Sequence, residues 1–338
     1  MVNMGNNQSM DKIITIGSAT RDSFFITDKD DVFRDPQDTS RTLIAFEFGT
    51  KVEIEDLRTM NGGGATNSAV SFSRLGFKSK TIARVGDDEL GHAVKKDLEK
   101  DGVDTSKITF DKKKRTGVSA IIIDKKTGER TVLFYPGANM DLKLDGLNDF
   151  EEAKLLYLAP ITSNIASESL PQVCVQAKEK GLSIAYNPSA KQLNSGYKSI
   201  EKIISCTDVL LMNRQEAGIL VSSYTGKKTA EYEADELLTY LQEMGPQTSV
   251  ITLGSGGSIA MSNGAIFKKA PFPAKAVDTT GAGDAFGSTF VASLITGNTV
   301  QRSLKLASIN ASSVISKYGA HTGLMTLKQL EKRMQKAA

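Results

Sequence analysis

From residue 155 onward, short apolar runs alternate with longer amphipathic segments, and this alternation constrains the fold more than any other feature of the chain. Apolar runs of this length are typical of buried strands, and the amphipathic segments between them are typical of helices. The expected strands cover residues 155–158, 183–186, 208–212 and 249–253. Strands that alternate with helices form a mostly parallel sheet with helices on both faces. The sequence therefore predicts a doubly wound α/β body.

Two segments in the first half of the chain predict antiparallel hairpins instead. Residues 42–55 alternate apolar and polar residues with Gly49 as a break, a pattern typical of a hairpin half open to solvent. A second pair of runs, residues 117–123 and 130–135, is joined by a turn-like stretch. Together they indicate a small separate β-sheet, which would form a lid over the ligand cleft.

The start of the chain sets the expected domain boundary. Residues 13–16 form a short apolar run, which predicts the first buried strand of the body. The polar residues before it predict a flexible tail over residues 1–11. We therefore expect a single α/β domain over residues 12–330, with the lid contributed by about residues 20–60 and 115–137.

The composition excludes several classes of protein. The 338 residues include 42 basic and 39 acidic ones, a net charge of +3, which is too balanced for a nucleic-acid-binding surface. Cys174 and Cys206 have no CxxC or Cys/His spacing, so we expect reduced core thiols and no zinc site. No apolar run approaches the ~20 residues of a membrane span, and the first residues lack the apolar centre of a signal peptide. We expect a cytoplasmic protein that acts on a small molecule, with no nucleic-acid or membrane partner.

The most informative stretch is AVDTTGAGDAF at residues 276–286, where small residues gather at the start of a helical pattern. Such a turn leaves backbone amides unpaired at the positive end of a helix dipole, and glycines allow a phosphate to approach closely. Asp284 would then lie beside the phosphate. We interpret it as the general base for an attacking hydroxyl, with the amides of Gly281, Ala282 and Gly283 as the anion hole. An N-terminal capping Asp is the competing interpretation.

Two other phosphate-binding patterns fail on spacing. The glycines at 281, 283 and 287 do not follow GxGxxG, and residues 299–306 offer no acid for a ribose 2′-hydroxyl. The GKKT at residues 226–229 lacks the preceding glycine of a Walker A sequence. The expected phosphate site is therefore neither a dinucleotide site nor a P-loop.

Several motifs follow one another along the chain: NGGGATNS at residues 61–68, VGDDELG at 85–91, NRQE at 213–216, TLGSGG at 252–257 and DTTGAGD at 278–284. In order and spacing they resemble the signatures of the PfkB family of carbohydrate kinases. The resemblance covers about residues 12–330 and leaves out the insertion-like segment 28–41. It implies a ribokinase-like, Rossmann-like fold and ATP-dependent, Mg²⁺-dependent phosphorylation of a small sugar such as ribose or fructose.

The resemblance also implies a role for each matching residue. Asp284 would be the catalytic base and Gly281, Ala282 and Gly283 the anion hole; Asp22, Gly62, Gly63 and Asn67 would contact the sugar; Asn187, Thr252, Gly254, Gly257 and Asn310 would contact ATP; Glu216, through water, and Asn213 would hold Mg²⁺; and a monovalent cation such as K⁺ would lie near Asp278. Taken alone, each polar residue has a plain structural interpretation, such as a first-turn acid for Glu216 or a turn residue for Asn187.

Other functions stay open from the sequence. A nucleoside kinase would need an aromatic clamp for a base, from Phe24, Phe46 or Phe134, and a phosphosugar kinase or a silent binding protein on the same fold are further alternatives. The basic run at residues 111–115 could receive a phosphorylated substrate, although a solvated charged face is the favoured interpretation. His92 and His321 are isolated, and neither is predicted to be catalytic. Exposed backbone of the lid sheet suggests a homodimer through the lid.

Overall fold

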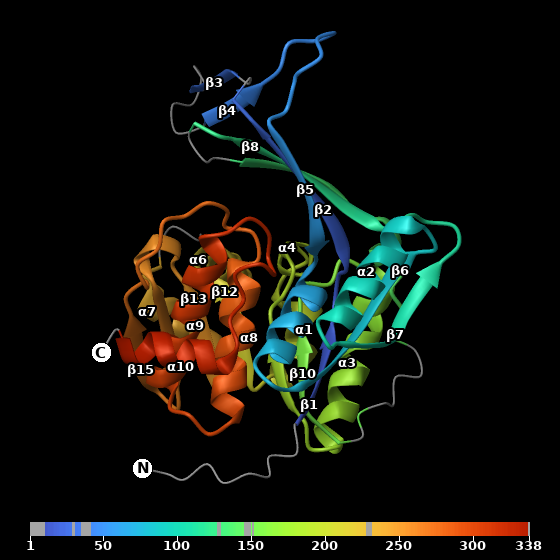
Figure 1. The fold of residues 1–338 in the computed structure, drawn as a ribbon. Coiled ribbons are helices and arrows are strands. Elements are labelled where there is room, and N and C mark those ends of the chain that lie inside the picture. Colours follow the sequence, from blue (N-terminus) through green and yellow to red (C-terminus); the bar gives the residue numbers. More distant parts are fainter. Residues whose placement is uncertain are drawn as a thin grey trace.

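The computed structural model describes residues 11–28, 31–34, 42–126, 130–144, 150, 152–227 and 232–336 (Figure 1). The tail predicted at residues 1–11 lies outside these ranges, apart from Asp11. No helix in the described part of the chain is long and apolar enough to cross a membrane.

The body is built on one large sheet. Within the described residues, nine strands pair in the order β15-β14-β13-β12-β11-β10-β1-β6-β7. Neighbours from β7 to β13 are parallel, and β14 and β15 add an antiparallel edge. The five predicted body strands are confirmed in this sheet. Its strands are β1 (Lys12–Ile16), β6 (Lys78–Gly86), β7 (Asp104–Asp111), β10 (Ala153–Leu158), β11 (Ser183–Tyr186), β12 (Val209–Asn213), β13 (Thr248–Thr252), β14 (Ser258–Ser262) and β15 (Ala265–Lys269).

Helices cover both faces of this sheet because successive side chains of a buried strand point to opposite sides. In β10, Leu156 and Leu158 pack in one core, and Leu155 and Tyr157 pack in the other. The first core contains α3 (Asn164–Glu179), α4 (Ala190–Asn194), α5 (Tyr197–Ser205), α6 (Arg214–Thr225) and α7 (Ala234–Glu243). The opposite face carries α1 (Gly64–Arg74), α2 (Glu89–Lys100), α8 (Ala282–Ile295), α9 (Val300–Ile315) and α10 (Leu327–Lys336). The predicted doubly wound body is confirmed.

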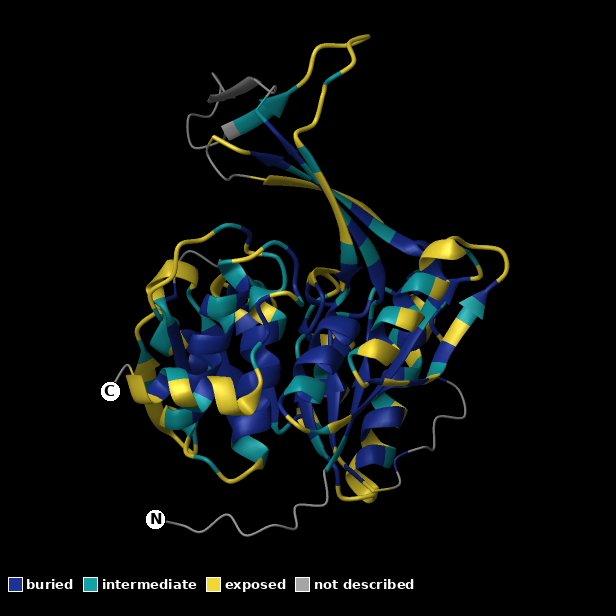
Figure 2. Cartoon of the chain, viewed as in Figure 1, coloured by how far each residue is buried: buried dark blue, intermediate teal, exposed yellow. Residues whose placement is uncertain are grey.

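A second sheet, called here the small sheet, rises from the body (Figure 1). Its order is β5 (Asp56–Gly62), β2 (Thr20–Thr27), β8 (Gly117–Asp124) and β9 (Arg130–Tyr135). β2 and β8 are parallel, and the other pairs are antiparallel. The predicted β8–β9 hairpin is confirmed, and residues 127–129 of its turn lie outside the described chain. Figure 2 shows the central body strands as buried, whereas β9 is exposed along its whole length and β5 is exposed over three consecutive residues.

The hairpin predicted over residues 42–55 is wrong. Only β4 (Thr42–Ala45) is a strand there, and it pairs with β3 (Asp31–Arg34), whereas residues 46–55 form no strand. Three apolar side chains of this segment, Phe46, Val52 and Ile54, instead line a pocket of about 260 Å³ with Phe25 and Ile122 on the outer face of the small sheet. Packing against that face explains the alternating pattern without strand pairing.

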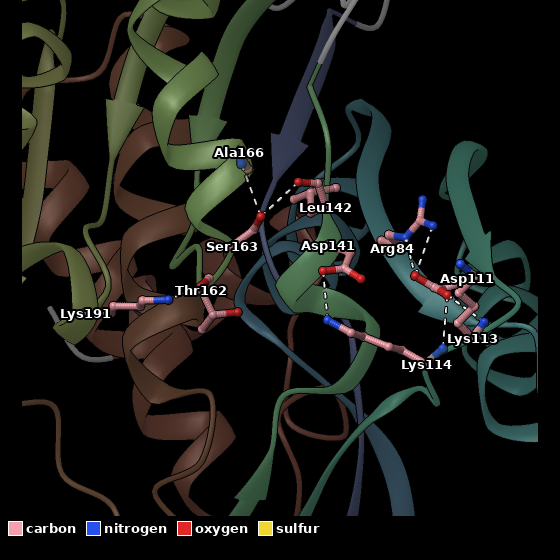
Figure 3. Close-up of polar contacts among 10 residues, drawn as sticks. All are labelled: Arg84, Asp111, Lys113, Lys114, Asp141, Leu142, Thr162, Ser163, Ala166 and Lys191. Carbon is pink, nitrogen blue, oxygen red and sulfur yellow. Dashed lines mark hydrogen bonds and ion pairs between the residues drawn. The ribbon is translucent and has the colours of Figure 1, made fainter.

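The basic run at residues 111–115 folds around Asp111 (Figure 3). The Asp111 carboxylate accepts the backbone N–H groups of Lys113 at 2.8 Å and Lys114 at 3.0 Å, and it pairs with Arg84 at 3.0 Å. These two backbone hydrogen bonds, and then Arg84, lower the pKa of Asp111 to about 2. Lys114 reaches across to Asp141 at 2.8 Å. The run is therefore a structured turn with exposed lysines, in line with the favoured interpretation.

We expect Asp111→Asn to lower the free energy of unfolding at pH 7 by about 1–2 kcal/mol, because charge-assisted hydrogen bonds are lost at a buried position. The pKa of Asp111 is below its ordinary value, so this contribution is complete above about pH 5 and is lost as the pH falls toward 2. Urea unfolding at pH 7 and pH 3 measures both effects. The matched control is Asp141→Asn, which breaks a half-exposed pair and should cost less than about 0.5 kcal/mol. Equal losses would contradict the prediction.

Candidate active site

The DTTGAGD segment forms the N-terminus of α8. Gly281 precedes the helix with φ 75°, and a Cβ there would lie 2.3 Å from Cβ of Ala320, so only glycine fits this turn. Ala282 donates its N–H to the carbonyl of Thr279 at 3.3 Å, whereas the N–H groups of Gly281 and Gly283 have no acceptor among the described residues. A Cβ on Gly283 would meet open space. Two of the three predicted anion-hole amides are therefore free at the positive end of a helix.

Asp284 lies in the first turn of α8 and is partly buried. Its Oδ2 accepts a hydrogen bond from Nδ2 of Asn67 at 2.7 Å, and its Oδ1 has no partner within the described chain. Burial raises the pKa of Asp284 to about 6, the Asn67 hydrogen bond opposes the rise, and the Asp22 and Glu216 carboxylates add to it. A carboxylate with one oxygen held and the other free can accept a proton near neutral pH.

Sequence reasoning missed His321. Its Nε2 lies 2.9 Å from Oδ1 of Asn67, although the two residues are 254 positions apart, so no local pattern pairs them. Asn67, on α1, is only 5% exposed, and His321 lies in the turn after α9, where Arg74 holds its carbonyl at 2.6 Å. Asn67 was expected to contact the sugar. In the structure its Oδ1 and Nδ2 are bonded to His321 and Asp284.

The other predicted sugar-contacting residues lie together where the small sheet joins the body. A Cβ on Gly62 would lie 1.9 Å from Oδ2 of Asp22. Gly63 has φ 99°, and a Cβ there would lie 2.4 Å from the carbonyl oxygen of Ser18. Asp22 is only 6% exposed, its Oδ1 accepts from Oγ1 of Thr20 at 2.9 Å, and burial raises its pKa. Gly62 thus lets the backbone pass directly against the Asp22 carboxylate, and Gly63 lets it pass against the backbone of Ser18.

Asp22 belongs to a row of side chains across one face of the small sheet, called here the inner face. The register pairs Asp22 with Ser119 on β8 and Ser119 with Phe134 on β9. Phe134 is 50% exposed, whereas Phe24 on the same face is fully buried and Phe46 belongs to the outer-face pocket. Of the three aromatic residues considered as a base clamp, Phe134 alone is exposed on the inner face.

A cavity of about 520 Å³ opens beside the N-terminus of α8. Thr252, Gly254 and Gly257, three of the residues predicted to contact ATP, line it together with Ala282 and Gly283. Its other walls are mostly apolar and small, and among the described residues that line it none is charged: Ser255, Ser258, Pro271, Phe272, Pro273, Ala274, Ala276, Thr279, Phe286, Ser308, Ala311, Ser312 and Ile315. The cavity therefore lies directly next to the free backbone amides at the N-terminus of α8.

Two other residues predicted to contact ATP do not line this cavity. Asn310 is fully buried, its Nδ2 donates to Oγ1 of Thr289 at 2.8 Å, and its Oδ1 accepts the N–H of Met325 at 3.0 Å. The Asn310 amide is thus bonded inside the core on both sides. Asn187 donates Nδ2 to the carbonyl of Leu211 at 2.8 Å and so links the ends of β11 and β12.

Asn213 and Glu216 form a reciprocal cap at the start of α6. Oδ1 of Asn213 accepts the N–H of Glu216, and Oε2 of Glu216 accepts the N–H of Asn213, both at 2.9 Å. Burial raises the pKa of Glu216. Its Oε1 has no partner in the described ranges, so this oxygen can accept a hydrogen bond from water. Nowhere in those ranges do three His, Cys, Asp or Glu side chains come together as a metal site.

Asp278 ties the α8 turn to the turn after α9. Its Oδ1 accepts from the N–H and Oγ1 of Thr280 at 2.9 and 2.7 Å, and its Oδ2 accepts the N–H of Gly319 at 2.9 Å.

The small sheet contacts the same region, because Arg130 of β9 donates to Oγ1 of Thr279. A movement of the small sheet would therefore change access to the N-terminus of α8.

Nearly the whole chain matches a known family. A family profile described as pfkB family carbohydrate kinase matches residues 11–327. An uncharacterized sugar kinase from Archaeoglobus fulgidus is 32% identical over 257 residues, which cover 75% of this chain and 98% of the relative. A ribokinase from Bacillus subtilis is 28% identical over 325 residues, which cover 95% of this chain and 99% of the relative.

Solved structures share the fold. An Arabidopsis thaliana ribokinase complexed with ribose and ATP matches with a TM-score of 0.78 and 21% identity, over 96% of this chain and 99% of that one. A nucleoside kinase from Methanocaldococcus jannaschii matches with a TM-score of 0.74 and 22% identity, over 97% and 99%. These likenesses confirm the predicted ribokinase-like fold.

Proposed function

The chain belongs to the PfkB family of carbohydrate kinases, and we propose that it transfers the γ-phosphoryl group of ATP to a hydroxyl of a small sugar, ribose- or fructose-like. The observation that carries this proposal is the Asp284 carboxylate, which has one oxygen held by Asn67 and the other free beside unpaired amides. A carboxylate in that position repels a phosphate, and a role as proton acceptor in the reaction explains why it lies there. The family itself establishes a phosphotransferase with an alcohol group as acceptor.

The proposed reaction uses the cavity and the inner face of the small sheet together. ATP lies in the cavity of about 520 Å³ along Thr252, Gly254 and Gly257, with its γ-phosphate at the N–H groups of Gly281 and Gly283. The acceptor hydroxyl attacks phosphorus in line, its proton passes to Oδ1 of Asp284, and the bond to the β,γ-bridging oxygen breaks to release ADP. The unpaired amides stabilise the charge on the transferring group.

The residues at the start of α6 fit a Mg²⁺ ion that is held through a bound water. The Oε1 atom of Glu216 is free to hold a metal-bound water, and Asn213 fixes the orientation of that carboxylate. A magnesium ion bound mainly by water and phosphate oxygens needs only one or two protein carboxylates. When bound, the ion neutralises charge on the phosphates. A monovalent cation near Asp278 and ATP contact by Asn187 are parts of the same proposal.

A second acceptor class is favoured by one observation. Phe134 lies two strands across from Asp22 on the inner face, and strands are spaced ~4.8 Å apart. With ribose hydroxyls on Asp22, a base attached to that ribose would reach the exposed Phe134 ring, where stacking is worth about 1–3 kcal/mol. A nucleoside is therefore the alternative acceptor.

We also propose that the small sheet closes as a lid and that two copies of the chain associate through its outer face. That face carries the apolar pocket of about 260 Å³, with Phe46 40% and Leu57 54% exposed. Burial of such side chains between copies would be favourable. Light scattering tests the association, and a strict monomer at working concentration would contradict it.

An acceptor panel tests the proposed function. ADP release is measured with Mg-ATP and free pentoses, hexoses, phosphosugars and nucleosides, with wild type beside Phe134→Ala. Turnover with a free sugar that is unaffected by Phe134→Ala supports the sugar kinase. Turnover with a nucleoside that falls at least ~10-fold in Phe134→Ala favours the alternative acceptor. No turnover with any class, together with sugar binding by calorimetry, would indicate a silent binding protein instead.

We expect kcat of the wild type to fall below about pH 6, because the proposed base must be ionised and burial raises the pKa of Asp284 to about 6. Activity should be flat above pH 7 and fall about tenfold for each further decrease of one in pH below 6. Rates at saturating Mg-ATP and acceptor between pH 5 and 8 measure this. A profile that stays flat down to pH 5 would argue against an acid of this pKa as the base.

A further inference from the structure

We propose that His321 is a positioning residue for phosphoryl transfer: it donates from Nε2 to Oδ1 of Asn67 and thereby fixes the Asn67 amide with its NH₂ group toward Asp284. This inference rests on the proposed function of Asp284 as the base. The three side chains form one hydrogen-bonded chain, with distances of 2.9 Å from His321 to Asn67 and 2.7 Å from Asn67 to Asp284.

The direction of the first hydrogen bond follows from the second. Oδ2 of Asp284 accepts, so Nδ2 of Asn67 must face it and Oδ1 of Asn67 must face His321. An amide oxygen only accepts, and Nε2 of His321 must therefore carry the hydrogen. The geometry thus assigns one tautomer of the ring.

The surroundings keep this ring neutral. Burial is the main cause that lowers the pKa of His321 to about 4. Arg74 and Arg21 act in the same direction, whereas Asp101 and Asp97 act against it. A ring that is neutral at pH 7 has one N–H, and the Asn67 contact places it on Nε2.

The opposite orientation of the Asn67 amide would disable the base. If the amide were flipped, Oδ1 would face Oδ2 of Asp284 at about 2.7 Å, and two acceptors would repel. The flip becomes favourable only if Asp284 is protonated and His321 presents a lone pair at Nε2. A His321 held as the Nε2–H tautomer blocks that exchange.

The fixed amide has two effects on Asp284. Donation from Nδ2 stabilises the ionised carboxylate against burial and lowers its pKa. It also occupies Oδ2, so that the acceptor proton is received at Oδ1, the oxygen without a partner in the described chain. Loss of the His321 hydrogen bond should weaken both effects without touching ATP or acceptor.

Nitrogen-15 NMR of the intact wild-type protein tests the tautomer directly. The chain has two histidines, so the variant His92→Gln assigns the remaining signal to His321. We expect the Nε2–H tautomer with no protonation down to about pH 5. The Nδ1–H tautomer, or a ring that protonates near pH 6.5, would overturn the proposal.

Kinetics test the positioning role. We expect His321→Leu to lower kcat about 10- to 100-fold with the KM for ATP unchanged, and to move the acidic limb of kcat to higher pH. His321→Gln keeps a donor and should remain within about threefold of wild type. Thr322→Val, one residue along the same turn, is the matched control and should be unchanged.

A double-mutant comparison separates the possible failures. Because His321 acts through Asn67, His321→Leu should add nothing to Asn67→Ala. The positioning role is wrong if kcat of His321→Leu equals that of wild type, or if kcat of His321→Gln is as low as that of His321→Leu. If Asp284→Asn is inactive in the same experiment, the proposed function nevertheless stands. If Asp284→Asn is as active as wild type, the proposed function itself fails. Should His321→Leu not fold, the NMR result decides.

Discussion

Asp284→Asn is expected to lower kcat at least ~10²-fold and up to ~10⁴-fold while the protein remains folded and still binds ATP. The substitution keeps the shape of the side chain and the acceptor for Asn67 but removes the atom that takes the proton. The N–H groups of Gly281 and Gly283 and the cavity are unaffected, so the affinity for ATP should fall by less than threefold, or about 0.6 kcal/mol. Steady-state ADP release and calorimetric ATP binding measure the two quantities.

The same substitution should stabilise the fold at neutral pH. Burial raises the pKa of Asp284 from 3.8 to about 6, so the folded state binds more protons than the unfolded state between these values. The stability of the wild type therefore falls as the pH rises through this window, by up to about 3 kcal/mol. The amide of the Asp284→Asn variant does not ionise, so the variant should be the more stable protein at pH 8 but not at pH 4. An inactive variant that is also less stable at pH 8 would indicate structural damage.

Gly62→Ala is expected to lower kcat/KM for the acceptor by ~10²-fold or more and to leave the KM for ATP within about threefold of wild type. The new Cβ would lie 1.9 Å from Oδ2 of Asp22, so the Asp22 carboxylate must leave its position. Two hydrogen bonds between a charged group and the acceptor are then lost, at about 1.5–3 kcal/mol each. Gly62, unlike Gly63, has no positive φ, so alanine is compatible with its backbone.

Asp22→Asn is the companion variant for this prediction. It should reduce kcat/KM for the acceptor to a similar extent, because Gly62→Ala acts by displacing Asp22. The double variant should be no worse than the poorer single variant. Steady-state kinetics with varied acceptor measure all three. Additive losses would show that Gly62 contributes something apart from Asp22.

The body of the fold could be predicted from the sequence, because its strands are buried on both faces and appear as continuous apolar runs. The small sheet was predicted only in part. β5 is an edge strand with three consecutive exposed residues, so it carries no alternating pattern. Residues 46–55 do carry apolar residues, but these pack on the outer face of the small sheet instead of pairing as a strand.

The candidate site was predictable where local sequence fixes local geometry. The α8 N-terminus depends on two glycines separated by one residue, and Asn213 caps α6 over a span of three residues. The His321 contact depends on two helices and a distant turn meeting, and nothing near His321 indicates it. The hydrogen bonds of Asn310 to Thr289 and Met325 were likewise not predictable, because they join a helix residue to two other segments of the chain.

The central claim is that Asp284 acts as the base for phosphoryl transfer to a small acceptor. Single-turnover transfer of label from γ-labelled Mg-ATP, with enzyme in excess over ATP and the acceptor found by the panel, isolates this step from product release. We predict rapid formation of labelled acceptor in wild type and formation at least ~10²-fold slower in Asp284→Asn with ATP bound. Equal rates of labelled acceptor formation in the two proteins would contradict the mechanism.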